Sequence, residues 1–187
     1  MTVAVLALQG AFIEHEQMLQ KLGVSTIQLR KKEDLEQDFD GLILPGGEST
    51  VQGKLLNDLG MFEPLKEKIL NGLPVLATCA GLILLAEKIS NDEKSYFASL
   101  PVTVRRNAYG RQLGSFHCEA EVKSIGTVPM EFIRAPYIES CSDDVDVLAK
   151  VDGNIVAVQY KSQLAMAFHP ELCDDTRIHE HFIQMIN

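Results

Sequence analysis

Short apolar runs alternate with longer amphipathic segments through the first half of the chain. Residues 2–8 form a continuous apolar run, typical of a strand buried on both faces of a parallel sheet. Further strands are predicted at residues 24–29 and 41–44, and helices, from apolar positions at helical spacing, at residues 11–22, 50–59 and 61–71. The polar residues 30–40 are expected to face solvent. This alternation of strand and helix predicts an α/β fold with a mainly parallel sheet.

The second half changes character, because its apolar runs are short and are separated by Gly, Pro, Asn and Asp. Strands are predicted at residues 103–106, 115–122, 131–135, 145–151, 154–159 and 163–168. Asp152 and Gly153 predict a β-hairpin over residues 145–159. A last helix is predicted over residues 174–186, with its apolar side chains on one face. No repeat, low-complexity tract or linker is seen, so we expect residues 1–187 to form one domain.

The stretch at residues 73–86 joins a short apolar run to a run of good helix formers through Thr-Cys-Ala-Gly. This pattern predicts a buried strand, a sharp turn and a helix. Cys79 then lies at the helix N-terminus, where the helix dipole favours the thiolate. The arrangement follows the logic of a nucleophile elbow, with sulfur in place of oxygen. A buried structural cysteine is the alternative, because free cysteine is among the most buried residue types.

His169 and Glu171 follow another apolar strand and form a second candidate for chemistry. In an extended backbone residues i and i+2 point the same way, so both side chains are expected to face one site. A carboxylate beside an imidazole fixes its tautomer and stabilises the imidazolium. Considered without Cys79, the His-Pro-Glu motif could also be part of a loop that has no catalytic role. Cys79 and His169 both follow predicted strands, and open α/β sheets place their sites at the carboxyl ends of strands. We therefore expect the two residues to meet at one edge of the sheet, as a nucleophile and its base.

The loop at residues 45–49 (PGGES) follows a buried strand and is the third candidate. A glycine-rich turn in this place can direct backbone N–H groups at an oxyanion. It is not a phosphate-binding P-loop, because five residues instead of four separate Gly47 from Gly53-Lys54, and Leu55 follows where Ser or Thr is required.

Composition narrows the remaining classes of function. The net charge is −9, which argues against a nucleic-acid or anionic-membrane surface. The four widely spaced cysteines form no C-x-x-C pair, so neither a zinc site nor a redox dithiol is indicated and a reducing cytoplasm is expected. No apolar run approaches the roughly 18 residues of a membrane span, and no secretory signal is seen.

The remaining histidines do not indicate a metal site. His179 and His181 are two residues apart on a predicted helix and therefore point in different directions. His15 and His117 are interpreted as surface or structural residues. We expect neither a metal ion nor a cofactor.

Taken together, the Ala77–Gly81 elbow, the residue 45–49 loop and the His-Pro-Glu motif resemble those of class I (triad) glutamine amidotransferases. More narrowly, six segments in order along the whole chain are similar to the glutaminase subunits of pyridoxal 5′-phosphate synthases: residues 8–11, 44–50, 78–83, 106–112, 133–136 and 168–172. The elbow and the His-x-Glu motif are shared by all class I amidotransferases, whereas the GGEST and RNxYGRQ runs are more specific. Ala77 is a departure, because the elbow usually carries Gly there; no loss of function is expected from its methyl group.

The resemblance implies a three-layer α/β/α, flavodoxin-like fold and the hydrolysis of L-glutamine to L-glutamate and ammonia. Cys79 would attack the side-chain amide, His169 would transfer protons, and Glu171 would orient His169. Backbone N–H groups at Gly47 and Ala80 would hold the oxyanion.

The resemblance also implies which residues bind glutamine: Gly47, Glu48, Ser49, Arg106, Ile133 and Arg134. The charged residues among them are of the right types, because an α-carboxylate requires an Arg and an α-ammonium requires an acid.

Nothing in this chain is suited to accept the ammonia, since it has neither a phosphate loop nor a second domain. The resemblance implies the synthase subunit of pyridoxal 5′-phosphate synthase as partner, which uses a pentose phosphate, a triose phosphate and ammonia; in the family the glutaminase is weak until this subunit docks. We hypothesise that Gln9 and Gly10, at the end of the first strand, lie near that interface. Two alternatives stay open: a glutaminase subunit of another synthase, such as that for imidazole glycerol phosphate, and a non-catalytic or stress-sensing α/β protein with a reactive elbow cysteine.

Overall fold

The computed structural model describes residues 1–108 and 115–186. Its strands are β1 (Thr2–Leu6), β2 (Ser25–Leu29), β3 (Gly41–Leu44), β4 (Val75–Thr78), β5 (Ala86–Ile89), β6 (Leu100–Arg105), β7 (Ser115–Val122), β8 (Gly126–Ile133), β9 (Tyr137–Cys141), β10 (Asp146–Val151), β11 (Asn154–Tyr160) and β12 (Gln163–Met166). Its helices are α1 (Phe12–Lys21), α2 (Ser49–Asp58), α3 (Phe62–Leu70), α4 (Ala80–Leu85) and α5 (Arg177–Ile186), with 3₁₀ turns η1 (Lys32–Glu36) and η2 (Pro170–Leu172).

The main sheet has a parallel region that contains the elbow strand. Its strands lie in the order β2-β1-β3-β4-β12, and all four pairings are parallel. Every residue of β3, β4 and β12 is buried, which explains why these segments are largely apolar. Beyond β12 the sheet continues through β11, β9, β6 and β5, where only the β5–β6 pairing is parallel. The predicted α/β class with a mainly parallel sheet is confirmed.

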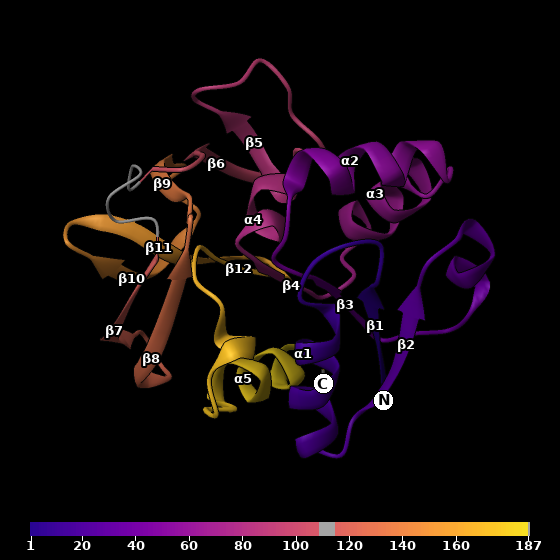
Figure 1. The fold of residues 1–187 in the computed structure, drawn as a ribbon, viewed down its shortest axis with the longest axis horizontal. Coiled ribbons are helices and arrows are strands. Elements are labelled where there is room, and N and C mark those ends of the chain that lie inside the picture. The colour runs from indigo at the N-terminus through magenta and orange to yellow at the C-terminus, as the bar shows by residue number, and fades with distance from the viewer. Residues whose placement is uncertain (109–114, 187) are drawn as a thin grey trace.

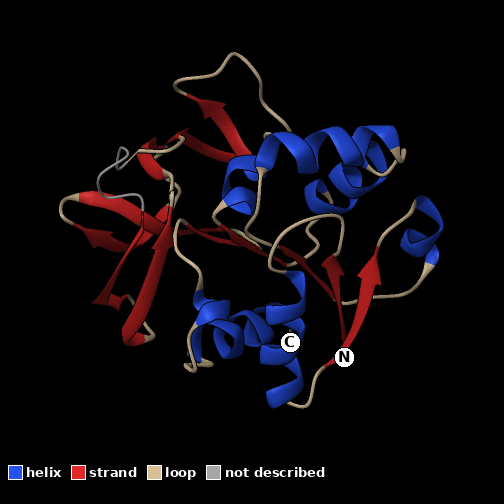
Figure 2. Cartoon of the chain, in the orientation of Figure 1, coloured by secondary structure: helices blue, strands red, loops and turns tan. Residues whose placement is uncertain are grey.

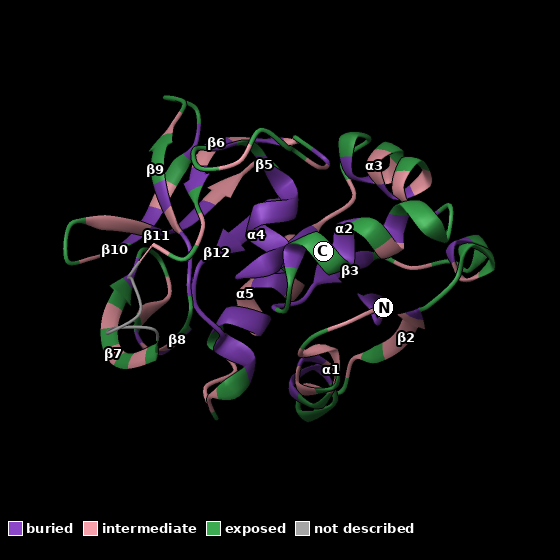
Figure 3. Ribbon diagram, turned by 45° about the horizontal axis from the view of Figure 1, so that its top comes forward, coloured by how far each residue is buried: buried purple, intermediate pink, exposed green. Residues whose placement is uncertain are grey.

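Helices cover both faces of the parallel region. Helices α1 and α5 lie on one face, and α2, α3 and α4 lie on the other (Figures 1 and 2). Helix α4 is buried along its whole length between the sheet and α2, as the colouring in Figure 3 makes visible. The β7–β8 hairpin forms a separate two-stranded sheet beside β10. The predicted β10–β11 hairpin is present, with antiparallel pairing around Asp152 and Gly153.

Most predicted elements are confirmed within three residues of their expected ends, but four differ. The helix after Cys79 is short, because Ala86 is extended (φ −56°, ψ 137°) and begins β5, which pairs with β6. Strand β9 was not predicted, since Glu139 and Ser140 break its apolar pattern. Strand β8 begins at Gly126, before the predicted residue 131. The polar residues 30–40 include η1, whose Leu35 is buried against the core.

No helix in residues 1–108 and 115–186 has the length and apolar character needed to cross a membrane.

Candidate active site

Strand β4 ends in a sharp turn at Cys79. The φ of 46° and ψ of −99° at this residue lie outside the conformations that L residues usually adopt, and α4 begins at the next position. Gly81 is required inside the turn, because a Cβ there would lie 2.1 Å from the carbonyl oxygen of Leu44. The Cys79 N–H donates to the Met166 carbonyl of β12 at 2.8 Å. The predicted strand, turn and helix are therefore present, and Cys79 is 6% exposed.

His169 and Glu171 lie just beyond β12, the neighbour of β4. His169 Nδ1 is 2.7 Å from Glu171 Oε1, so the predicted pair is formed. The extended backbone from which it was predicted is wrong: Pro170 begins the turn η2, in which the Leu172 N–H donates to the His169 carbonyl at 3.3 Å. The His169 N–H donates to the Glu131 carbonyl of β8 at 2.8 Å, which ties the turn to the β7–β8 hairpin.

The charges of this group support one another. Burial alone would lower the pKa of His169, but hydrogen bonds to Cys79 and Glu171 and the negative charges of both raise that pKa to about 10. Burial alone would raise the pKa of Glu171, but His15 and His169 hold it below its ordinary value. An ionised carboxylate only accepts hydrogen bonds, so Nδ1 of His169 carries a proton. This leaves Nε2 of His169 to exchange a proton with Cys79.

The glycine loop after β3 packs against the imidazole. A Cβ added to Gly46 would lie 2.2 Å from His169 Cε1, so the ring and the loop are in close contact. The Gly46 N–H donates to Thr78 Oγ1 at 3.0 Å, which fastens the loop to the last residue of β4. The loop, the base and the nucleophile's own strand therefore form one packed unit.

The next residue of this loop has a free donor. The Glu48 N–H donates to Gln9 Oε1 at 2.7 Å, but within residues 1–108 and 115–186 the Gly47 N–H has no acceptor. Ala80 occupies the first position of α4, where helix geometry provides no intrahelical acceptor for its N–H. Both residues predicted to form the oxyanion site thus have backbone donors available beside Cys79.

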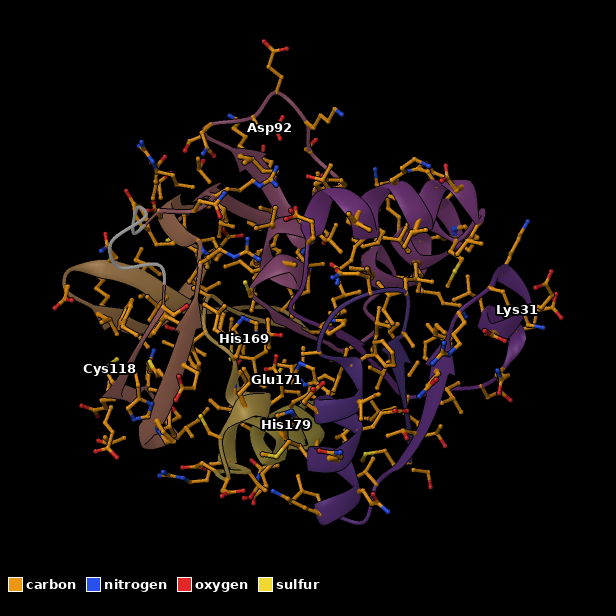
Figure 4. The ribbon with its side chains drawn as sticks, viewed as in Figure 1. Lys31, Asp92, Cys118, His169, Glu171 and His179 are labelled. Atoms are coloured by element: carbon orange, nitrogen blue, oxygen red, sulfur yellow. The ribbon has the colours of Figure 1, made fainter. Side chains whose placement is uncertain are left out.

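One pocket joins the predicted residues. It is lined by Cys79 and His169 and by all six residues predicted to bind glutamine; Gln9, Ile83 and Asn107 complete its wall. Glu171 lies behind His169, away from the pocket, with a fully buried side chain. Figure 4 shows His169, Glu171 and His179 in succession from the end of β12 toward α5.

Arg106 is held at the rim of the pocket by acidic and hydroxyl groups. Its Nη2 donates to Glu48 Oε1 at 3.2 Å and to Thr50 Oγ1 at 3.0 Å, and its Nη1 donates to Asp92 Oδ2 at 3.0 Å. Arg106 and Glu48, predicted to bind opposite ends of the substrate, thus pair with each other. A zwitterionic amino acid has a carboxylate that can pair with Arg106 and an ammonium that can pair with Glu48. It can therefore separate these two side chains and still neutralise the charge of both.

The other rim residues come from the end of β8. Ile133 is its last residue and is 40% exposed, and Arg134 follows with a φ of 44°. The sequence run at residues 106–112 begins at this rim with Arg106 and Asn107, while its residues 109–112 lie outside the described part of the chain.

Sequence reasoning missed the position of His15. The residue is fully buried on α1, and its Nε2 lies 3.4 Å from Glu171 Oε2. A signal was present, because His15 falls at helical spacing between the apolar residues Phe12 and Leu19 and therefore on the apolar face of the helix. His117 is instead exposed and pairs with Glu131.

In the described residues no three His, Cys, Asp or Glu side chains lie together in a way that could hold a metal ion.

Comparison with known proteins agrees with the geometry. The chain matches the SNO glutamine amidotransferase family over residues 5–187. It is 65% identical to the pyridoxal 5′-phosphate synthase subunit PdxT of Desulfitobacterium hafniense (strain DSM 10664 / DCB-2), covering 100% of this chain and 94% of the relative. It is 54% identical to the protein of the same name from Streptococcus pneumoniae (strain CGSP14), covering 99% and 97% of the two chains.

Among solved structures, a glutamine amidotransferase superposes with a TM-score of 0.93 at 41% identity and covers 98% of each chain. The resemblance drawn from the elbow, the glycine loop and the His-x-Glu motif is thereby confirmed. This chain belongs to the SNO glutamine amidotransferase family.

Proposed function

We propose that this chain is the glutaminase subunit of a pyridoxal 5′-phosphate synthase and hydrolyses L-glutamine to L-glutamate and ammonia. The observation that carries the proposal is that Cys79 and His169 line one pocket at the carboxyl ends of two neighbouring parallel strands, with His169 paired to Glu171. The names of the relatives at 65% and 54% identity support the assignment to this synthase.

In the first half of the reaction the Cys79 thiolate attacks the side-chain amide carbon of glutamine. The carbonyl oxygen becomes an oxyanion, which the N–H groups of Gly47 and Ala80 stabilise. The His169 imidazolium gives its proton to the amide nitrogen, the C–N bond breaks, and ammonia leaves a glutamyl thioester on Cys79.

In the second half neutral His169 takes a proton from water, whose oxygen attacks the thioester carbon. The C–S bond breaks, glutamate is released, and the thiolate–imidazolium pair is restored. Glu171 stays ionised throughout and keeps the imidazole in the productive orientation.

Substrate recognition uses the rim of the pocket. Arg106 and Arg134 offer positive charge for the α-carboxylate, and Glu48 offers negative charge for the α-ammonium. Gly47, Ser49 and Ile133 complete the glutamine site.

The ammonia passes to the synthase subunit, which is the partner of this chain. Gln9 is the residue through which docking would act, because its side chain accepts the Glu48 N–H directly beside Gly47. We expect Gln9→Ala to reduce the activation of glutaminase by the partner. Unchanged activation in this variant would exclude Gln9 from that role. We place the complex in the cytoplasm, where the four cysteines, all free, would stay reduced.

The test is glutamate release from glutamine by this chain alone and with the synthase subunit of a close relative. Wild type should be activated by the synthase, Cys79→Ala should release no glutamate, and Cys118→Ala, a cysteine outside the pocket on β7, should match wild type. If wild type releases no glutamate with or without the partner, the glutaminase assignment is wrong and a reactive-cysteine protein remains.

A further inference from the structure

A buried polar network lies directly behind the proposed catalytic group, on α1. His15 Nε2 is 3.1 Å from Thr78 Oγ1 and 3.4 Å from Glu171 Oε2. Thr78 Oγ1 also accepts the Gly46 N–H at 3.0 Å. A single imidazole therefore contacts the acid that orients the base and the hydroxyl that fastens the glycine loop.

The other side of this imidazole meets a second histidine. His15 Nδ1 is 3.0 Å from His179 Nε2 on α5, and both residues are fully inaccessible to solvent. Burial lowers the pKa of both rings, so both are neutral near pH 7. The remaining charged or titratable groups that act on His15 are Glu171, His169 and Glu14.

The contact with the Glu171 carboxylate places the proton of His15 on Nε2. The ionised Glu171 can only accept, so an unprotonated Nε2 would set a lone pair against a carboxylate oxygen. Unpaired donors do not separate the two tautomers. With the proton on Nε2 of His15, the Thr78 hydroxyl finds no acceptor among the described residues, and with the proton on Nδ1, the buried Nδ1 of His179 carries an unpaired N–H. The carboxylate contact therefore decides the tautomer, and Nδ1 of His15 accepts the His179 Nε2–H.

Glu171 needs such a neighbour. Its Oε1 is satisfied by His169, but Oε2 is buried and makes no hydrogen bond within the described residues. A buried carboxylate oxygen without a compensating dipole is costly, and the Nε2–H of His15 supplies that dipole from 3.4 Å.

We propose that His15 is a positioning residue for the glutaminase reaction, whose Nε2–H holds Glu171 through Oε2 and steadies the Gly46 loop through Thr78, while the His179 Nε2–H donates to its Nδ1. The inference rests on the proposed function of Cys79, His169 and Glu171. His15 touches neither substrate nor nucleophile, so its effect should appear in the reactivity of the pair Cys79–His169 and in kcat, with KM little changed.

The first test needs no substitution. In a long-range ¹H–¹⁵N correlation spectrum of the wild-type protein, His15 should show the Nε2–H tautomer. The Nδ1–H tautomer, or a charged ring at pH 7, would overturn the proposal. This measurement is independent of glutaminase activity, so it separates a failure of this inference from a failure of the proposed function.

The second test compares His15→Gln with His15→Met. In both variants the terminal atom is three bonds from Cβ, as Nε2 is in histidine, but only Gln carries an N–H there. Met18→Ala on the same helix is the control for lost core packing, because Met18 is buried and makes no hydrogen bond to His15, Thr78, Glu171 or His179.

Two readouts apply to these variants. One is the pH dependence of Cys79 alkylation by chloroacetamide, located by mass spectrometry; the other is kcat and KM for glutamine in the complex with the synthase subunit. In His15→Met we expect the alkylation midpoint to rise by about one pH unit and kcat to fall about tenfold, with KM changed less than about twofold. His15→Gln should recover most of both effects, and Met18→Ala should lose thermal stability without changing either.

Equal impairment in His15→Gln and His15→Met would show that packing, not the N–H, is what matters, and would overturn the proposal. A His15→Met variant that matches wild type in both readouts would overturn it as well.

Discussion

The catalytic group and the rim of the pocket lie side by side but in opposite surroundings. Cys79, His169 and Glu171 are each at most 6% exposed, whereas the side chain of Glu48 is 49% exposed and Ile133 is 40% exposed. The buried group is held by the parallel sheet, where charges interact strongly and side chains have one arrangement. The rim comes from loops and strand ends in contact with water. Substitutions in the first region should therefore change kcat, and those in the second should change KM.

The largest effect is expected for Glu171→Gln. This variant keeps the shape of the side chain but removes the charge that holds the His169 imidazolium, so kcat should fall about 10³- to 10⁴-fold with little change in KM. The matched control is Glu131→Gln, which breaks an exposed His–Glu pair of the same 2.7 Å separation. Steady-state glutaminase assays of the two variants in the complex give the comparison. Similar losses in both would mean that burial is not what makes the Glu171 pair important.

The next effect is expected for Gly46→Ala. The added methyl group would lie 2.2 Å from His169 Cε1, and because the loop is fastened to Thr78 the ring must move. A displacement of about 1 Å should lower kcat about 100-fold.

The control for this variant is Gly53→Ala, where the methyl group would lie 2.1 Å from Tyr96 Cε1, a side chain outside the pocket. Its kcat should be close to that of wild type. An active Gly46→Ala enzyme would contradict the close packing of loop and base.

A rim substitution should behave differently. Arg106→Lys keeps the charge but loses the fork that joins Glu48, Thr50 and Asp92, so KM should rise about tenfold while kcat stays within a few-fold of wild type. Arg105→Lys, at the neighbouring position and paired with Glu139 outside the pocket, should leave KM unchanged. A loss confined to kcat in Arg106→Lys would remove the distinction between the two regions.

The buried region should also show itself in the pH dependence of stability. The pKa of His169 is raised from 6.5 to about 10 in the folded chain, so its stabilising contribution is complete below pH 6.5 and is lost as the pH rises toward 10. The free energy of unfolding should therefore fall over this window, by at most about 1.4 kcal/mol per pH unit from this one group.

The measurement is urea denaturation of wild type and of His169→Gln at several pH values. The difference between the two curves should decline from pH 6.5 to 10. A flat or rising difference would contradict the raised pKa.

The smallest effect is expected at Ala77, where the resemblance to class I amidotransferases implies Gly. Ala77 is fully buried in β4 between Leu44 of β3 and Ala165 of β12. Ala77→Gly should cost about 1 kcal/mol of stability, from one lost methyl group and a freer unfolded backbone, and change kcat less than about twofold. Denaturation and activity measured on one preparation decide this, and a large gain in activity would mean that Ala77 constrains the turn.

Sequence reasoning predicted the parallel region well because strands buried on both faces leave an unambiguous apolar signal. It missed β5, since a helix and a strand joined without a loop read as one apolar run through residues 82–86. It missed β9, where polar residues face outward. The pattern of apolar residues along the sequence reflects which residues are buried. This signal is weak where a strand is short or half exposed.

The site shows the same limit. Cys79, the glycine loop and His169 could be found because each follows a buried apolar strand and is accompanied by Gly or Pro, which end strands. The contact of His169 with Glu171 was predicted from the wrong backbone geometry, since Pro170 begins a 3₁₀ turn instead of continuing the strand. His15 was not found, because a lone histidine on an apolar helix face gives no sign of what it will meet from Thr78 and Glu171, far away in the sequence.

The His169 amide donates a hydrogen bond to the Glu131 carbonyl, so the backbone of the catalytic base is tied to strand β8, which ends at Ile133. Any ligand that restrains the rim at Ile133 and Arg134 also restrains that strand, and with it the opening motion by which the His169 amide would exchange its hydrogen for solvent deuterium. The rate of hydrogen exchange at the His169 amide should therefore report whether the rim is occupied. Exchange should slow when a ligand fills the rim, even in a variant that performs no chemistry.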